Sequence, residues 1–190
     1  MHNGTEAGVD EVVLLSPDGV EIGTASKAAV HGPDTPLHLA FSCYLRDDDG
    51  RILMTRRALT KRTWPGVWTN SFCGHPGPGE AVVDAVRRHA LLELGADFVD
   101  LELELPLFRY RAVDPSGVVE HEICPVYSAR LASPLRPSPA EVMDHAWVEP
   151  MELVAATRAT PWAFSPWLVL QVELLERFHT DRADRVEARA

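Results

Sequence analysis

The sequence predicts one α/β domain, equally described as α+β, in which helices sandwich a mixed β-sheet. Two observations carry this prediction. The segments are mostly strand-like, with one amphipathic helix in the middle of the chain and helices at its end, an order typical of a mixed sheet flanked by helices. The chain has 190 residues, of which 46% are hydrophobic, which is enough for one domain with a sizeable core.

Two hairpins are predicted in the first third of the chain. Residues 11–15 and 20–23 are short strands separated by a Ser-Pro-Asp-Gly turn. Residues 37–46 (LHLAFSCYLR) and 51–57 are longer strands separated by the tight turn Asp-Asp-Asp-Gly. Both pairs join apolar runs through residues that favour turns, so we expect antiparallel neighbours.

The amphipathic helix is predicted over residues 80–94, because apolar residues recur there at helical spacing and Gly95 is suited to end it. Downstream, residues 101–113 and 118–129 are strands joined by an Asp-Pro-Ser-Gly turn. The remaining predicted elements are short: a loop over 58–68, a strand over 69–74, a proline-rich loop over 134–139, a strand over 145–148, and helices over 151–157 and 163–179.

Charge and composition exclude several classes of protein. The formal net charge is −10, so a general nucleic-acid binder is not expected, and any anion site must concentrate its own positive charge. No apolar run approaches the roughly 20 residues that span a membrane. The N-terminus lacks the basic segment and apolar core of a secretory signal, so we expect a cytoplasmic protein. Three cysteines, an odd number, do not predict a disulfide framework.

Two short patterns bring reactive side chains onto common faces. Cys73 and His75 are two apart near a predicted strand, so they point to the same side. Glu120 and Glu122 share a face in the same way, within an otherwise apolar strand. Two carboxylates this close repel unless a positive charge lies between them or one of them holds a proton. Each pattern taken alone also has a purely structural explanation. Cys73 and His75 could be a buried cysteine beside a hydrogen-bonded histidine, and Glu120 and Glu122 could lie on the solvated face of a strand.

His31 and His38 flank the start of the strand predicted over 37–46. With His75, Glu120 and Glu122 they make a set of three imidazoles and two carboxylates. Such a set suits a roughly octahedral ion, Mn²⁺ or Mg²⁺, better than the four-ligand geometry of structural zinc. Spacing alone does not bring the five side chains together, so this site is a hypothesis.

The segment around the amphipathic helix resembles the Nudix box, G-x5-E-x7-R-E-U-x-E-E-x-G-U, where U is a bulky apolar residue. The matching positions are Gly74, Glu80, Arg88, Glu93 and Gly95. His89 and Leu92 stand where Nudix hydrolases carry glutamates that bind the metal for diphosphate cleavage. The resemblance therefore implies a Nudix-like fold with impaired hydrolysis.

Eight further runs resemble type I isopentenyl-diphosphate isomerase, and they occur in the order of that family. They extend from about His31 to Trp167 and are LHLAFS, TRRALTKR, WPGVWTN, SFCGHP, FRYRAVDPSG, VEHEICPV, EVMDHAW and TPWAFSPW. The resemblance implies that the protein isomerises isopentenyl diphosphate to dimethylallyl diphosphate by protonation and deprotonation. It also implies a single isomerase domain over 11–179, which we expect to lie between a flexible N-terminus (1–10) and a charged tail (180–190).

The resemblance also implies a role for each matched residue. One ion, Mn²⁺ or Mg²⁺, would bind His31, His38, His75, Glu120 and Glu122, and a second Mg²⁺ that arrives with the diphosphate would bind Glu93. Cys73 and Glu122 would be the acid–base pair, Tyr110 would hydrogen-bond at Glu122, and Trp167 would face the hydrocarbon. Lys27, Arg57 and Lys61 resemble the cationic residues that meet the phosphates, whereas Arg56 and Arg62 are interpreted as solvated.

Two alternatives stay open: a Nudix hydrolase of a diphosphate substrate, and a metal-binding regulator that has lost catalysis. The substitutions at 89 and 92 count against the first, and the presence of both Cys73 and Glu122 counts against the second. A small-molecule diphosphate is the expected partner, with no nucleic acid and no membrane, for a monomer or weak dimer.

Overall fold

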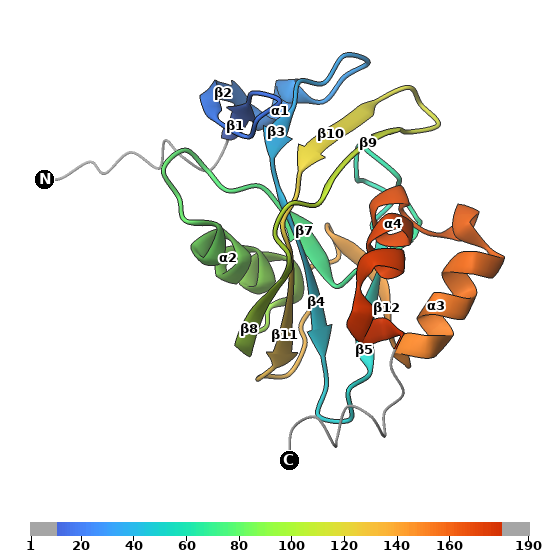
Figure 1. The fold of residues 1–190 in the computed structure, drawn as a ribbon. Helices are drawn as coiled ribbons and strands as arrows, with labels where there is room; N and C mark the ends of the chain where they lie inside the picture. Colours follow the sequence, from blue (N-terminus) through green and yellow to red (C-terminus); the bar gives the residue numbers. More distant parts are fainter. Residues whose placement is uncertain (1–10, 180–190) are drawn as a thin grey trace, which may run out of the picture.

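The computed structural model describes residues 11–179, which form two β-sheets and the helices around them (Figure 1). The five-stranded sheet has the order β2-β1-β3-β10-β9 (Glu21–Ser26, Glu11–Leu15, His38–Leu39, Val119–Ile123, Arg109–Val113). The seven-stranded sheet has the order β12-β5-β4-β11-β8 (Val142–Val148, Ile52–Arg57, Phe41–Arg46, Val126–Leu131, Phe98–Leu105). Its two short strands, β6 (Trp68–Thr69) and β7 (Phe72–Gly74), pair with β5 and β4.

Helices cover both faces of the seven-stranded sheet, as predicted. Figure 1 shows α2 (Val82–Leu94) on one side and α3 (Pro150–Ala159) with α4 (Pro166–Leu174) on the other. The short helical elements are α1 (Lys27–Val30), η1 (Pro161–Ala163) and η2 (Glu176–Phe178). The predicted α/β fold is therefore confirmed, but the sequence did not reveal the second sheet. The segments predicted at 1–10 and 180–190 lie outside the described residues.

Strand β4 divides the core into two clusters because its side chains alternate between the two faces. Phe41, Cys43 and Leu45 pack in the cluster that includes the buried face of α2. Ala40 and Tyr44 pack in the other cluster, with residues of α3 and α4. Burial on both faces explains why this segment reads as a nearly continuous apolar run.

The prediction of one continuous strand over 37–46 is wrong at Ala40, where the chain leaves one sheet for the other. The second half of the chain breaks at the same level, because Pro125 separates β10 from β11 and a proline has no amide hydrogen for a ladder. Strand β10 pairs with β3 and β11 with β4, both in parallel. The predicted strand over 101–113 is likewise divided, into β8 and β9. These breaks lie between the two sheets, where the polar residues gather.

Local turn chemistry predicted several elements well. The β1–β2 and β9–β10 hairpins form as expected, and α2 ends at Gly95, whose left-handed φ of 56° suits glycine. The hairpin between β4 and β5 is confirmed only at its turn, where Arg46 pairs with Ile52. Farther from the turn, β4 pairs with β7 and β5 pairs with β6. The last helix begins at Pro166 rather than at 163, with proline in its first turn.

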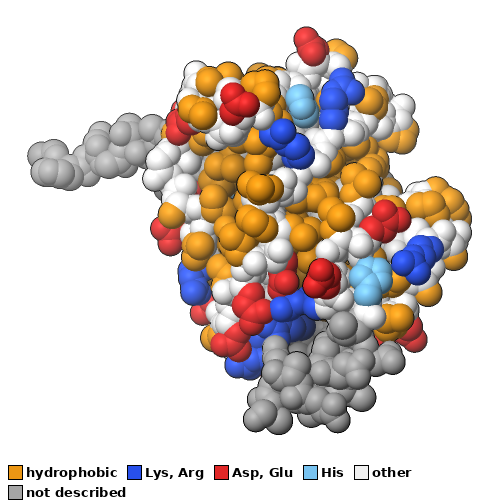
Figure 2. Space-filling model, viewed as in Figure 1, with side chains coloured by type: hydrophobic (Ala, Val, Ile, Leu, Met, Phe, Trp, Pro, Cys, Tyr) orange, Lys and Arg blue, Asp and Glu red, His pale blue; other side chains and the backbone are white. Residues whose placement is uncertain are grey.

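Charged side chains of both signs share the surface with apolar ones. On the face shown in Figure 2, Lys and Arg side chains lie next to Asp and Glu, and apolar side chains occupy the middle. Within residues 11–179, no helix is long and apolar enough to cross a membrane. The three cysteines are all free.

Candidate active site

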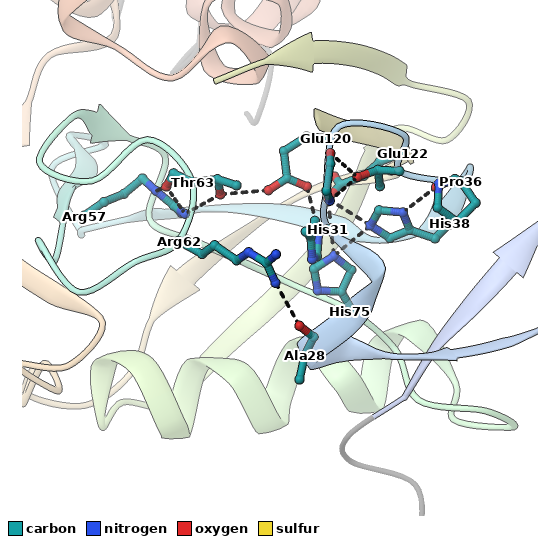
Figure 3. A network of polar contacts seen from close by, with 12 residues as sticks. Ala28, His31, Pro36, His38, Arg57, Arg62, Thr63, His75, Glu120 and Glu122 are labelled. Carbon is teal, nitrogen blue, oxygen red and sulfur yellow. Dashed lines mark hydrogen bonds and ion pairs between the residues drawn. The ribbon is translucent and has the colours of Figure 1, made fainter. Parts of the chain in front are cut away.

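Three histidines and two glutamates meet where the two sheets separate (Figure 3). His31 follows α1, His38 lies on β3, and His75 follows β7. Their ring centroids lie 5.1 to 5.6 Å apart, and the two Nε2 atoms of His38 and His75 are 3.2 Å apart. Glu120 and Glu122 reach the same place from β10, and both are buried. The alternative of a solvated strand face is therefore wrong for this strand.

Ligand atoms of His31, His38, His75 and Glu122 all lie within 4.8 Å of one another. Glu122 Oε1 is 3.3 Å from His75 Nε2 and 3.6 Å from His38 Nε2. Glu120 stands beside this group, with Oε2 3.0 Å from His31 Nε2. Neither of these two buried atoms has a hydrogen bond within the described chain. Buried, convergent imidazole and carboxylate groups, two of whose ligand atoms lack a hydrogen bond, fit a divalent ion.

The protonation state of His75 favours the same interpretation. Burial lowers the pKa of His75 to about 4, so its imidazole is neutral at neutral pH, as a ligand must be. Burial would raise the pKa of Glu122, but its hydrogen bonds with His38 and His75 outweigh burial and hold the pKa well below its ordinary value. His38 Nδ1 is 2.9 Å from the carbonyl oxygen of Pro36, and an N–H donated there leaves Nε2 with a free lone pair.

Cys73 lies on β7 opposite Ser42 of β4, at the wall of the same cavity. Its Sγ is 3.1 Å from Asn70 Oδ1 and 3.4 Å from Ser42 Oγ. Burial raises the pKa of the Cys73 thiol to about 12. The thiol therefore holds its proton at neutral pH, while Glu122 is a carboxylate.

Aromatic side chains form another part of the cavity wall. Trp167 is 3% exposed, and its ring centroid lies 5.8 Å from that of Tyr110 and 5.5 Å from that of Trp64. Tyr110 faces Glu122 across the β9–β10 ladder. The expected hydrogen bond between these two residues does not form in the described structure, so Tyr110 contributes an aromatic surface beside the carboxylate.

The cations expected to meet phosphates also line this cavity, which has a volume of about 510 Å³. Burial, and then the neighbouring Lys61, lower the pKa of Lys27. Arg57 lies 5.3 Å from the Trp167 ring centroid and donates to the carbonyl oxygen of Thr63. Lys61 forms an ion pair with Glu141. These three cations, one of them paired with an acidic side chain, therefore line the cavity of an acidic protein.

Some residues of the cavity were missed at the sequence level. Thr63 donates to Glu120 Oε1 at 2.8 Å and so links Arg57 to the carboxylate cluster (Figure 3). Arg62 lines the cavity and donates to the carbonyl oxygen of Ala28, so it belongs to the site although its side chain is exposed. In the sequence, only the position of Arg62 next to Lys61 indicated that it belongs to the site. Arg56 is half-buried and donates to the Gly66 carbonyl, so its interpretation as a solvated side chain is wrong.

The box helix contributes His89 and Glu93 to the cavity, with Nδ1 and Oε1 of the two residues 2.8 Å apart. Arg88 forms an ion pair with Glu80 at 2.7 Å, which ties the start of the box to its helix. A Cβ at Gly74 would lie 2.5 Å from the His89 ring. A side chain at 74 would therefore force the His89 ring to move.

Comparison with known proteins agrees with the fold. The sequence profile of the NUDIX domain matches residues 36–168. DR0079 from Deinococcus radiodurans superposes with a TM-score of 0.68 at 20% identity, covering 87% of this chain and 98% of that one. A MutT protein from Methanosarcina mazei Go1 gives 0.59 at 17% identity, over 77% and 97%. At these identities the structures show the fold, and the chain is a NUDIX domain protein.

Closer relatives define the family within that class. The isopentenyl-diphosphate Delta-isomerase of Agromyces mediolanus is 64% identical over 179 residues, which cover 93% of this chain and 87% of the relative. That of Leifsonia xyli subsp. xyli is 62% identical over 168 residues, covering 87% and 91%. The chain belongs to the isopentenyl-diphosphate Delta-isomerase family.

Proposed function

We propose that this protein converts isopentenyl diphosphate into dimethylallyl diphosphate by moving one carbon–carbon double bond. The observation that carries the proposal is that Cys73 and Glu122 line one cavity together with His31, His75 and the cations. A proton added to one end of the double bond gives a tertiary carbocation. Loss of a proton from the neighbouring carbon then gives the isomer, so the site needs two proton carriers.

Cys73 and Glu122 are suited to be these carriers because they differ in protonation. The buried thiol holds a proton and the carboxylate lacks one. Each turnover transfers one proton to the hydrocarbon and takes one from it, and the two residues exchange roles when the reaction runs backward.

His31, His38, His75, Glu120 and Glu122 would hold one Mn²⁺ or Mg²⁺. When bound, the ion supplies positive charge that keeps both carboxylates together and tunes the acidity of Glu122. Glu93 would help to hold a second Mg²⁺ that enters with the diphosphate. His89, which lies where the hydrolases have a glutamate, supports the carboxylate of Glu93 through its 2.8 Å contact.

The aromatic wall would stabilise the carbocation. A desolvated cation on the face of tryptophan gains about 2 kcal/mol, or about one and a half decades of rate. General acid–base transfer adds roughly 10²–10⁴-fold. Burial of Trp167 and Tyr110 also keeps water from the cation, which would otherwise be trapped as an alcohol.

Lys27, Arg57 and Lys61 would bind the diphosphate. Their positive charges lie at the cavity while the chain as a whole carries −10, so the anion is attracted to this part of the surface. Leu92 lines the same cavity where Nudix hydrolases have a metal-binding glutamate. Phosphate binding without phosphate cleavage is the expected result.

Isomerisation is tested by incubating metal-loaded protein with isopentenyl diphosphate and measuring both dimethylallyl diphosphate and free phosphate. Cys73→Ala should abolish turnover while metal content and melting temperature change little. Cys43→Ala is the matched control, because it removes a thiol buried on the α2 side of the sheet, and it should retain activity. Release of phosphate without isomer would instead support a hydrolase, and full activity of Cys73→Ala would remove this residue from the mechanism.

The preference for Mn²⁺ or Mg²⁺, the cytoplasmic location and the state of monomer or weak dimer stay predictions. Metal analysis of the purified protein tests the metal preference, and its sedimentation behaviour tests the oligomeric state.

A further inference from the structure

A row of buried polar side chains leads from helix α4 to the sulfur of Cys73. Gln171 and Ser42 are 0% exposed, and Tyr44 is 1% exposed. Gln171 lies four residues after Trp167, so both side chains leave the same face of α4. Three polar groups in an apolar core are costly unless they are hydrogen-bonded, so their arrangement calls for a physical reason.

The hydrogen bonds in this row have one direction. Tyr44 donates its hydroxyl proton to Gln171 Oε1 at 2.8 Å, which fixes the amide with Nε2 toward Ser42. Gln171 Nε2 then donates to Ser42 Oγ at 2.9 Å. Since Ser42 accepts that bond, its own proton is free for a sulfur, and the Sγ atoms of Cys73 and Cys124 each lie 3.4 Å away.

Asn70 holds the same thiol from another side. Its Nδ2 donates to the carbonyl oxygens of Cys43 and Phe72, so its Oδ1 is fixed toward Cys73 and accepts the thiol proton at 3.1 Å. Trp167 Nε1 donates to this same Oδ1 at 2.9 Å. Helix α4 therefore contacts the partners of Cys73 on both sides, through Trp167 and Asn70 and through Gln171 and Ser42.

We propose that Gln171 and Ser42 are positioning residues for the isomerase reaction: Gln171, oriented by Tyr44, aims the Ser42 hydroxyl at Cys73 and fixes the sulfur at the cavity wall. This inference rests on the proposed role of Cys73. Two directed contacts restrict a side chain that has one rotatable bond to a single rotamer, and proton transfer to carbon is sensitive to such placement.

The positioning role is tested with Ser42→Ala, Gln171→Met and Tyr44→Phe. Each should lower kcat, by about 10-fold for the first two and about 3-fold for the third, with KM for isopentenyl diphosphate and metal content unchanged. A 10-fold loss corresponds to about 1.4 kcal/mol. Ser42→Thr, which keeps the hydroxyl, should recover most of kcat. Ser128→Ala is the matched control, a buried serine with two hydrogen bonds outside the cavity, and it should leave kcat unchanged.

A second readout does not depend on turnover. The S–H stretching band of Cys73, assigned by its loss in Cys73→Ala, should shift in Ser42→Ala, Gln171→Met and Tyr44→Phe but not in Ser128→Ala. A purely structural role would lower the melting temperature and leave this band in place. If Ser42→Ala does not fold, Tyr44→Phe decides, because it keeps the ring that packs against Phe178.

An unshifted band, or a kcat within two-fold of the Ser128→Ala control, would overturn the inference. Its failure is distinct from failure of the proposed function. Wild-type protein that forms no dimethylallyl diphosphate would refute the function, whereas the band would still report whether Ser42 is aimed at Cys73.

Discussion

Replacement of Trp167 by leucine tests how the site stabilises positive charge. The change keeps an apolar side chain but removes the π face and the indole N–H that donates to Asn70 Oδ1 at 2.9 Å. Loss of about 2 kcal/mol of cation–π stabilisation lowers kcat about 30-fold. The lost hydrogen bond is worth about 1 kcal/mol more and acts on the support of Cys73.

Trp167→Phe separates these two effects, because it keeps an aromatic face and removes the same N–H group. We expect it to retain about ten times the kcat of Trp167→Leu. The control is Trp162→Leu, because Trp162 belongs to the same segment but is 81% exposed, and its activity should match wild type. Rates are measured at saturating isopentenyl diphosphate, below the melting temperature of each variant. Equal kcat values for the phenylalanine and leucine variants would refute the cation–π argument.

Three further outcomes are expected. Glu141→Gln frees Lys61 from a partly exposed ion pair worth about 0.2–1 kcal/mol, so KM for the diphosphate should fall up to about five-fold; an unchanged KM in steady-state kinetics would exclude competition between Glu141 and substrate. Gly74→Ala should displace His89 and lower both melting temperature and activity, because the new Cβ would lie 2.5 Å from the ring; normal activity would show that the helix adjusts freely. Burial would raise the pKa of Asp114, but hydrogen bonds from Ser116 and from the Trp64 amide outweigh burial and lower it. This carboxylate therefore stabilises the fold above its unfolded pKa of about 3.9, and the contribution is lost as pH falls through the lower folded value. In urea titrations, the stability difference between wild type and Asp114→Asn should be constant near neutrality and narrow below about pH 4; a constant difference down to pH 2 would contradict this.

Local signals in the sequence predicted much of the fold. The turn at Asp114 and the end of α2 at Gly95 follow from residue chemistry that acts within a few positions. The break at Ala40 could not be found in this way, because LHLAFSCYLR is a nearly continuous apolar run and either sheet can bury it. Only the pairing of β3 with β10 and of β4 with β11 determines where the chain changes sheets.

The residues of the candidate site likewise fall into those that the sequence predicted and those that it did not. Its histidines, Cys73 and the paired glutamates were found because such residues are rare in apolar segments, and the family resemblance gave them roles. Thr63 and Glu141 were missed because their side chains reach the cavity from elements whose orientation depends on distant contacts. Gln171 was missed because its position in α4 gives no sign that it reaches Ser42 on β4.

The most direct test of the account is proton NMR of isopentenyl diphosphate incubated in D₂O with protein stripped by a chelator and then reloaded with Mn²⁺ or Mg²⁺. Product is analysed after the paramagnetic ion is removed. The account predicts no reaction of the stripped protein, and dimethylallyl diphosphate with deuterium in a newly formed methyl group after reloading. Product without deuterium, full activity of the stripped protein, or release of phosphate in place of the isomer would contradict it.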